Sequence, residues 1–294
     1  MTACICCGVE MKPHQTGIKD WEYGVPWNSE LVKCPGCGLV AHQPAIRADQ
    51  IDSLYPGNYL AHSSASRKRG IYGYLKSVFG NLSALVVAKY LPRSGTCLEV
   101  GCGNGQFLKI LAALRDDIRV IGVDVKDTKI EDVPRFTFHH GQLEELSLPS
   151  GCTDVVYCSN LIEHVCNPLI FLNECHRILK PHGIIYGVTP DHLSLDRYIF
   201  GKYWGGYHYP RHTFVFDHDN IIRILKKAGF MEPTVRGGYS FWYTSFANRL
   251  FKLPGTKSRG FAFAAITAVF APVDYLINVF QCHGSMTFVA RKQP

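Results

Sequence analysis

The sequence predicts a doubly wound α/β fold with a small cysteine-containing module at its N-terminal end. Residues 96–189 alternate between short apolar runs and helical segments, as expected of a parallel sheet with crossover helices. A glycine-rich turn at 101–105 follows the first of these runs. Two C-x-x-C pairs, at 4–7 and 34–37, precede the α/β region. These three observations indicate where the functional residues should be sought.

Composition limits the classes of protein that fit. The chain has 294 residues, of which 47% are hydrophobic and 19% charged, enough to bury a sizeable core. No basic segment followed by an apolar run opens the sequence, so we expect no secretory signal, a cytoplasmic location and reduced cysteines. The longest apolar run, 260–273, is shorter than the about 20 residues of a spanning helix. A net charge of +7 suits an anionic partner without identifying one.

The first half of the α/β region contains the glycine turn. The segment 96–100 is expected to be a buried strand that runs into this turn, and a helix then continues through Leu114. A second strand at 119–123 ends at Asp124, and a short strand surrounds 136–138. The α/β region thus begins with a strand, a turn, a helix and a second strand, which is how nucleotide-binding folds of this type begin.

The second half continues the alternation. We expect a fourth strand at 153–158, a helix at 168–179 that ends before Lys180-Pro181-His182-Gly183, and a fifth strand at 184–189. A further helix at 219–228 is closed by Gly229 at its C′ position. The last segment, 285–291, alternates as a final strand should.

The paired cysteines indicate a zinc site. Cys4 and Cys7 have the same spacing as Cys34 and Cys37, and each pair is followed by a glycine that tolerates a tight turn. Two such turns give four thiolates around one tetrahedral ion, so we expect a structural zinc ribbon at residues 1–45. Four unrelated buried cysteines would not explain the repeated spacing, and Cys6 is expected to be a bystander.

The remaining chain divides into two further parts. Residues 46–92 should form a helical connector, which either packs on the next domain or acts as a lid over an active site. Residues 93–294 should form the α/β domain, with insertions at about 190–217 and 239–283.

The glycine turn indicates the kind of ligand. It reads G-x-G-x-G, and Gln106 stands where a dinucleotide fingerprint has its third glycine. Glu99, at the strand edge, would repel a pyrophosphate and attract a cation, whereas Asp124 is placed to accept hydrogen bonds from ribose hydroxyls. A ribose, an ammonium group and no phosphate describe S-adenosylmethionine (SAM).

Five ordered blocks resemble the class I SAM-dependent methyltransferases over residues 93–294. The blocks are Glu99-Val100-Gly101-Cys102-Gly103-Asn104-Gly105, Asp124, Asp154-Val155-Val156, Leu161-Ile162-Glu163-His164-Val165 and Arg177-Ile178-Leu179-Lys180-Pro181-His182-Gly183. The resemblance implies a seven-stranded, Rossmann-like sheet whose final hairpin includes the one antiparallel strand.

The same resemblance implies the cofactor-binding residues. Glu99, Gly101 and Gly103 would hold the methionine end, Asp124 the ribose, and the stretch 141–143 the adenine, although the family often has an acid where Gln142 stands. The expected set is Glu99, Gly101, Cys102, Gly103, Asp124, Gln142, Leu143 and Asn160.

His164 is the first candidate for a catalytic base, because it follows the fourth strand at the edge where an acceptor would meet the cofactor. Some quinone-type O-methyltransferases bind a divalent metal there through E-x-x-E-H, but Asn160 replaces the first acid in this chain. The missing carboxylate argues against a catalytic metal. His164 could instead be a structural residue at a helix start.

The segment 203–212 is the second candidate, with four aromatic residues, two histidines and an arginine. It is similar to a tryptophan-rich "PRH" block of many bacterial methyltransferases and suits an acceptor pocket. We expect Tyr207, His208 and His212 to contribute to catalysis. The alternative is that Arg211 and His212 only tie this loop to the sheet.

The insertion 239–283 is rich in aromatic residues and has Lys252, Lys257 and Arg259 just before an apolar run. Apolar surface beside basic residues would allow peripheral contact with a membrane. A packed subdomain that lines the acceptor pocket, or a dimer face, is the more ordinary interpretation, and the chain could be a monomer or a homodimer.

Three functions fit these features, two of them enzymatic and one of them binding without catalysis. The first is methylation of a small-molecule acceptor of sugar, lipid-linked or natural-product type, at oxygen or carbon. The second is methylation of RNA, which some zinc ribbons bind, but the ribbon has no excess of basic residues. The third, a binding protein that keeps the fold without catalysis, is disfavoured by the intact glycine turn.

Overall fold

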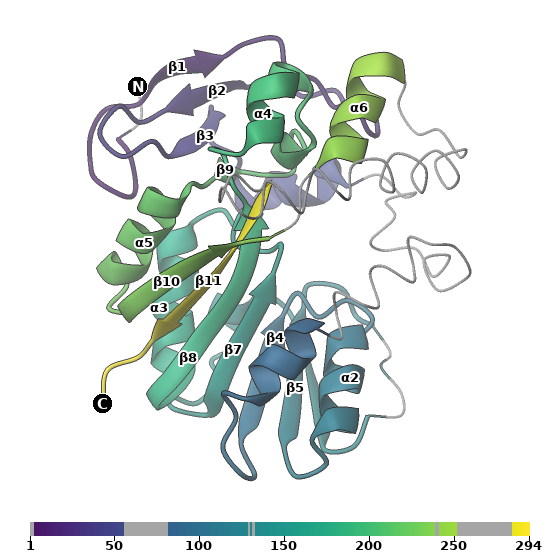
Figure 1. Ribbon diagram of the computed structural model, residues 1–294, viewed down its shortest axis with the longest axis vertical. Coiled ribbons are helices and arrows are strands. Elements are labelled where there is room, and N and C mark those ends of the chain that lie inside the picture. The colour runs from purple at the N-terminus through teal and green to yellow at the C-terminus, as the bar shows by residue number, and fades with distance from the viewer. Residues whose placement is uncertain (1–2, 56–81, 129, 131–132, 239–240, 252–283) are drawn as a thin grey trace.

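The structure, a computed structural model, describes residues 3–55, 82–128, 130, 133–238, 241–251 and 284–294 (Figure 1). The described chain contains two sheets. The large one has the strand order β10-β11-β8-β7-β4-β5-β6, and the small one has the order β1-β2-β3-β9. In Figure 1 the small sheet lies above the carboxyl ends of the parallel strands of the large one.

The large sheet is the mixed, Rossmann-like sheet that the sequence predicts. Strands β8, β7, β4, β5 and β6 are parallel, and β11 is antiparallel to both β8 and β10. The strands are β4 (Thr96–Val100), β5 (Arg119–Asp124), β6 (Phe136–His140), β7 (Thr153–Ser159), β8 (Leu179–Pro190), β10 (Met231–Gly237) and β11 (Ser285–Arg291). Every residue of the central strand β4 is buried, as a strand covered on both faces must be.

The expected helices form, and local capping explains their ends. They are α2 (Gln106–Leu114), α3 (Pro168–Ile178) and α5 (His218–Lys227). The Asn167 side chain accepts hydrogen bonds from the first free N–H groups of α3, and Asp217 and Asn220 form a reciprocal capping box on α5. Gly229 follows α5 with a φ of 89°, so the predicted glycine C′ position is confirmed.

One strand begins earlier than expected, and one strand was not predicted. Strand β8 begins at Leu179, where a helix end and a turn were expected, because Thr153 of β7 pairs with Leu179 before an irregularity in the ladder. Strand β10 has no segment of its own in the predicted elements. Its residues are exposed or half-buried and include Pro233, so its sequence lacks the apolar signal of a strand.

The small sheet joins two distant parts of the chain. Strands β1 (Lys12–Gln15), β2 (Glu30–Lys33) and β3 (Val40–Gln43) form an antiparallel meander. The fourth strand, β9 (Phe214–Val215), comes from the segment that was expected to be an insertion, and it pairs with β3. The N-terminal module is therefore continuous in hydrogen bonding with the α/β part.

The described chain also contains shorter helices. They are the 3-10 helices η1 (Ala48–Leu54), η4 (Leu143–Glu145), η5 (Gly201–Tyr203) and η6 (Gly205–Tyr207), a helix at 82–88, and α4 (Leu195–Phe200) and α6 (Trp242–Phe251). Most of the predicted lid and the apolar run with its basic residues fall at 56–81 and 252–283, outside the described residues. Within the described ranges, no helix is both long and apolar enough to cross a bilayer.

Candidate active site

The glycine turn connects β4 to α2 at the carboxyl edge of the large sheet. Gly101, Gly103 and Gly105 all have left-handed φ angles, of 72°, 51° and 69°. The N–H groups of Gly101 and Cys102 donate to the carbonyl of Val123, at 2.8 and 3.2 Å. These bonds fix the turn against β5, and only glycine adopts such angles without strain.

The turn leaves room for a ligand on its outer side. A Cβ atom at Gly103 would meet nothing within 4 Å, whereas one at Gly101 would lie 3.1 Å from the Leu161 side chain. The Cys102 side chain points into the core, where it packs against Gly122. Cys102 can therefore contribute only its backbone to a ligand. Glu99 is buried beneath the turn, at 7% exposure.

Asp124 holds the turn and keeps capacity for a ligand. Its Oδ2 accepts a hydrogen bond from the N–H of Gly103 at 2.8 Å, and its Oδ1 accepts one from the N–H of Lys126 at 2.9 Å. Each carboxylate oxygen has a further lone pair. The side chain can therefore accept two hydroxyl groups while it keeps the turn in place.

The remaining expected cofactor residues lie along the same edge of the sheet. Gln142 is exposed just after β6, and Asn160 is exposed just after β7, where its N–H donates to the carbonyl of Val188. The Leu143 side chain is buried in the core at 1% exposure, so only its backbone faces this edge. A flat ligand would therefore meet the amide of Gln142 rather than the side chain of Leu143.

A second group of functional side chains gathers beyond β7. Possible ligand atoms of Glu163, His164 and His212, here called the Glu-His-His trio, all lie within 4.8 Å of one another. Glu163 and His164 follow β7, whereas His212 comes from the segment before β9. The fold thus brings His164 and His212 together, and their rings meet edge to face at 4.5 Å between centroids.

Glu163 is the most buried member of the trio. Its Oε2 accepts a hydrogen bond from the hydroxyl of Thr189 on β8 at 2.9 Å, and its Oε1 lies 3.9 Å from Nε2 of His212. Burial of the whole side chain raises the pKa of Glu163 to about 8, because the charged form is poorly solvated there.

Backbone carbonyls orient both histidines. Nδ1 of His212 lies 2.8 Å from the carbonyl of Gly206, and Nδ1 of His164 lies 3.1 Å from the carbonyl of Arg211 and 3.0 Å from the hydroxyl of Tyr55. A carbonyl only accepts, so Nδ1 donates in these bonds and Nε2 keeps its lone pair. Burial lowers the pKa of His212 well below its usual value, so this ring is neutral at pH 7.

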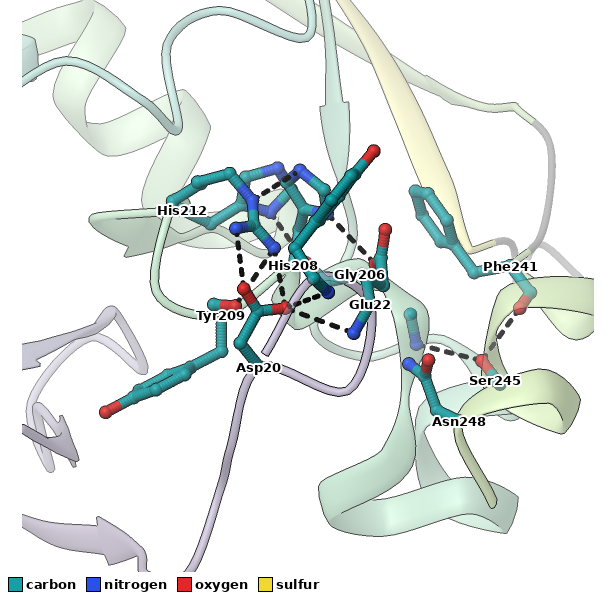
Figure 2. Close-up of polar contacts among 12 residues, drawn as sticks. Asp20, Glu22, Gly206, His208, Tyr209, His212, Phe241, Ser245 and Asn248 are labelled. Carbon is teal, nitrogen blue, oxygen red and sulfur yellow. Dashed lines mark hydrogen bonds and ion pairs between the residues drawn. The ribbon is translucent and has the colours of Figure 1, made fainter. Parts of the chain in front are cut away.

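The other two predicted catalytic residues are engaged in structural contacts. Nδ1 of His208 lies 3.0 Å from Oε1 of Glu22, and its Nε2 accepts a hydrogen bond from Nε of Arg211 at 2.9 Å (Figure 2). The hydroxyl of Tyr207 lies 3.4 Å from Nε2 of His192, and burial raises the pKa of Tyr207 to about 12. These contacts favour a supporting role for both residues.

Arg211 joins this block to the N-terminal module. Its guanidinium is fully buried and forms two hydrogen bonds with the carboxylate of Asp20, at 2.8 and 2.9 Å (Figure 2). Burial alone would raise the pKa of Asp20, but the contact with Arg211 lowers it below its usual value. This geometry fits the expected alternative, in which Arg211 holds its loop in place. The loop is held to the N-terminal module, however, and not to the large sheet.

Sequence reasoning missed Asp20, Glu22 and Tyr55 as parts of this site. The signal that could have indicated them was an arginine within an aromatic block. Such an arginine is expected to be buried, and a buried guanidinium requires a carboxylate partner. The acids of the N-terminal module were the candidates.

A shallow hollow opens beside the block. It is a small depression, open to solvent, between the N-terminal module, the segment 202–209 and α6. Its lining residues include Asp20, Glu22, Lys202, Tyr207, His208 and Asn248. The hollow adjoins the trio through His208, whose ring is 6.2 Å from that of His164.

The sulfur atoms of the four predicted metal-binding cysteines lie close together. Sγ atoms of Cys4 and Cys37 are 3.5 Å apart, and those of Cys7 and Cys34 are 3.3 Å apart. All four lie within 4.8 Å of one another, which is the donor set of a tetrahedral thiolate site. Cys6 is outside this cluster and contacts the carbonyl of Asn220 on α5, as expected of a bystander.

The sheet order, the glycine turn and Asp124 together define a Rossmann-like domain with the strand arrangement of a methyltransferase. A family model described as a methyltransferase domain matches residues 74–231. This match covers more than half of the chain, and the chain belongs to this family.

Several named proteins are similar to this chain. A Mycolicibacterium smegmatis protein that bears the name of a SAM-dependent methyltransferase is 33% identical over 137 residues, which is 45% of this chain and 51% of the relative. A ubiquinone biosynthesis O-methyltransferase from Cereibacter sphaeroides is 28% identical over 178 residues, 54% of this chain and 71% of the relative. The chain spans about half the length of several curated relatives that it matches.

Solved structures share the fold. A SAM-dependent methyltransferase from Archaeoglobus fulgidus gives a TM-score of 0.50 at 21% identity and covers 74% of this chain and 94% of its own. A chain from a Haloferax volcanii complex between a methyltransferase activator and a methyltransferase gives 0.54 at 15% identity, with 85% and 100% covered. At these identities the likeness concerns the fold alone.

Proposed function

We propose that this chain transfers a methyl group from SAM to a hydroxyl group of a small organic acceptor. The observation that carries the proposal is the Glu-His-His trio, which lies at the same edge of the large sheet as the glycine turn. Hydroxyl acceptors must lose a proton during methyl transfer, and neutral imidazole is a suitable base. The similarity to a named O-methyltransferase supports oxygen as the acceptor atom.

The residues of the turn fit SAM. The outer side of Gly103 is open, Glu99 places a buried carboxyl group beneath the turn, and Asp124 keeps two lone pairs for ribose hydroxyls. Gln142 would hydrogen-bond to the adenine amine through its side-chain oxygen. When bound, SAM supplies an electrophilic methyl group on a sulfonium ion.

The trio and the block 203–212 would act on the acceptor. His164 or His212 would accept the hydroxyl proton through Nε2, because both rings are oriented by hydrogen bonds at Nδ1. Aromatic residues of the block would line the acceptor side of the site and exclude water. His208 and Tyr207 would keep these walls in place.

We further propose that Cys4, Cys7, Cys34 and Cys37 bind a structural zinc ion and that residues 1–45 form the ribbon that this ion stabilises. The four clustered thiols support this assignment. Asp20 and Glu22 of the ribbon contact Arg211 and His208, so the ribbon would shape the acceptor side of the active site.

Label transfer to fractionated cell extract tests the proposed acceptor class. The protein is incubated with SAM labelled in its methyl group and with polar metabolites, lipids and RNA kept apart. We expect label in the polar or lipid fraction. Label confined to RNA would contradict the proposal and favour the RNA methyltransferase alternative.

Replacement of Asp124 by alanine tests the cofactor assignment. The change removes an acceptor for the ribose and the partner of the Gly103 N–H, so SAM affinity should fall by about 10-fold or more. Isothermal titration calorimetry measures the loss. Asp116→Ala is the matched control, because Asp116 is exposed before β5, at the other end of that strand. Equal affinities for Asp124→Ala and wild type would refute the assignment.

A further inference from the structure

The Glu-His-His trio has the donor set of a metal site. Two imidazoles and one carboxylate form the facial arrangement that binds Fe²⁺ and related first-row divalent ions and leaves positions open for exogenous ligands. Nε2 of His212 and Oε1 of Glu163 are 3.9 Å apart, too long for a hydrogen bond. Two ligand atoms at about 2.0–2.2 Å from one ion are about 3.0–3.5 Å apart, so these two atoms would move less than about 1 Å closer on binding an ion.

Each ligand is held by the kind of contact that supports metal ligands. Nδ1 of His212 bonds to the carbonyl of Gly206, and Nδ1 of His164 bonds to the carbonyl of Arg211. Metal-binding histidines almost always donate their second N–H in this way, which fixes the tautomer and the ring orientation. The hydroxyl of Thr189 orients the remaining oxygen of Glu163.

Burial of Glu163 gives independent support. The residue is completely buried, and its Oε1 has no hydrogen-bond donor among the described residues. An unsatisfied carboxylate oxygen in the interior is costly, and a bound cation removes that cost. The oxygen lies on the side of His212, the side on which an ion between the three residues would lie.

The fold also supplies a third ligand that the local sequence lacks. Asn160 replaces an acid in the E-x-x-E-H pattern, which argued against a metal. The structure instead brings His212 to the trio from the segment that follows β8 and α4 in the chain. His208 is excluded as a ligand, since Glu22 and Arg211 occupy both of its ring nitrogens.

We propose that Glu163, His164 and His212 form a second metal site, separate from the cysteine cluster, which binds a divalent cation of the Mn²⁺ to Zn²⁺ series. If the proposed function holds, on which this second step rests, the ion would replace the histidine base: its open positions would bind the acceptor oxygen and favour its deprotonated form, and the proton would pass to solvent. Cation binding itself does not depend on the identity of the acceptor.

Cobalt binding to the full-length protein that carries one zinc ion per chain tests the site without SAM or acceptor. Co²⁺ is titrated by calorimetry, and bound cobalt and zinc are counted by elemental analysis after gel filtration. We expect one Co²⁺ per chain in addition to the zinc. Glu163→Gln, which keeps the size and the acceptor for Thr189, and His212→Ala should each weaken Co²⁺ binding by at least about 10-fold while zinc content stays constant.

His218→Gln is the matched control, because His218 lies at the same edge of the sheet, 3.2 Å from Asp191, but outside the trio. It should bind Co²⁺ as wild type does. Absence of a second metal equivalent in the wild type, or unchanged affinity in Glu163→Gln, would overturn the proposal. Glu163→Gln decides the outcome if His212→Ala does not fold.

Methyl transfer is measured separately, so the two proposals fail in different ways. Cation binding without methyl transfer to any fraction would support the metal site and refute the proposed function. Methyl transfer by a protein that binds no second metal equivalent would support the proposed function and refute the metal site.

Discussion

Replacement of Cys34 and Cys37 by serine is expected to abolish zinc binding and to unfold the N-terminal module. The two residues supply half of the clustered thiols, and zinc contributes on the order of 10 kcal/mol to the folding of small modules of this kind. The small sheet has short strands and little core of its own. Zinc content by elemental analysis and the thermal unfolding profile measure the effect.

The same variant should lose methyl transfer but keep SAM affinity. Unfolding of the module removes Asp20 and Glu22 from Arg211 and His208, whereas the glycine turn has its own contacts with β5. Cys152→Ser is the control, because this half-buried thiol lies outside the cluster. Unchanged zinc stoichiometry in the double variant would show that the cysteines are not ligands.

Asp20→Asn is expected to lower the free energy of unfolding by about 3–5 kcal/mol. The change keeps the shape of the side chain but leaves the fully buried guanidinium of Arg211 without its counter-charge. Urea denaturation measures the loss. We also expect the catalytic rate to fall with little change in SAM affinity, because Arg211 precedes His212 in the chain and its carbonyl orients His164.

Asp49→Asn provides the matched control. Asp49 pairs with Arg47 at 2.7 Å, but both side chains are about two-thirds exposed, at 68% and 66%. Exposed pairs contribute little, so this variant should unfold as the wild type does. Equal stabilities for Asp20→Asn and Asp49→Asn would show that the buried pair does not hold the module to the α/β part.

Local sequence patterns were sufficient for most of the large sheet. The glycine turn, its flanking strand and helix, and Asp124 lie within 30 residues and are defined by backbone angles and apolar runs that sequence displays directly. The cluster of four cysteines could be predicted equally well, because C-x-x-C spacing determines how one turn presents two thiols.

Long-range contacts could not be predicted in the same way. Strand β9 has only two residues and forms only because β3 is beside it. The pairing of Asp20 with Arg211 spans 191 positions, and the approach of His212 to Glu163 depends on how the segment between β8 and β9 folds back. Neither periodicity nor residue type records such contacts, although a buried arginine does require an acid somewhere.

Mass spectrometry of the product formed with SAM that carries a deuterated methyl group is the most direct test of the proposed reaction. The fraction that accepts most label is used, and wild type is compared with Asp124→Ala. We predict a small-molecule product with one deuterated methyl group on oxygen, formed by the wild type and strongly reduced in the variant. A methyl group found on nucleic acid or on nitrogen, or the same yield from both proteins, would contradict the assignment.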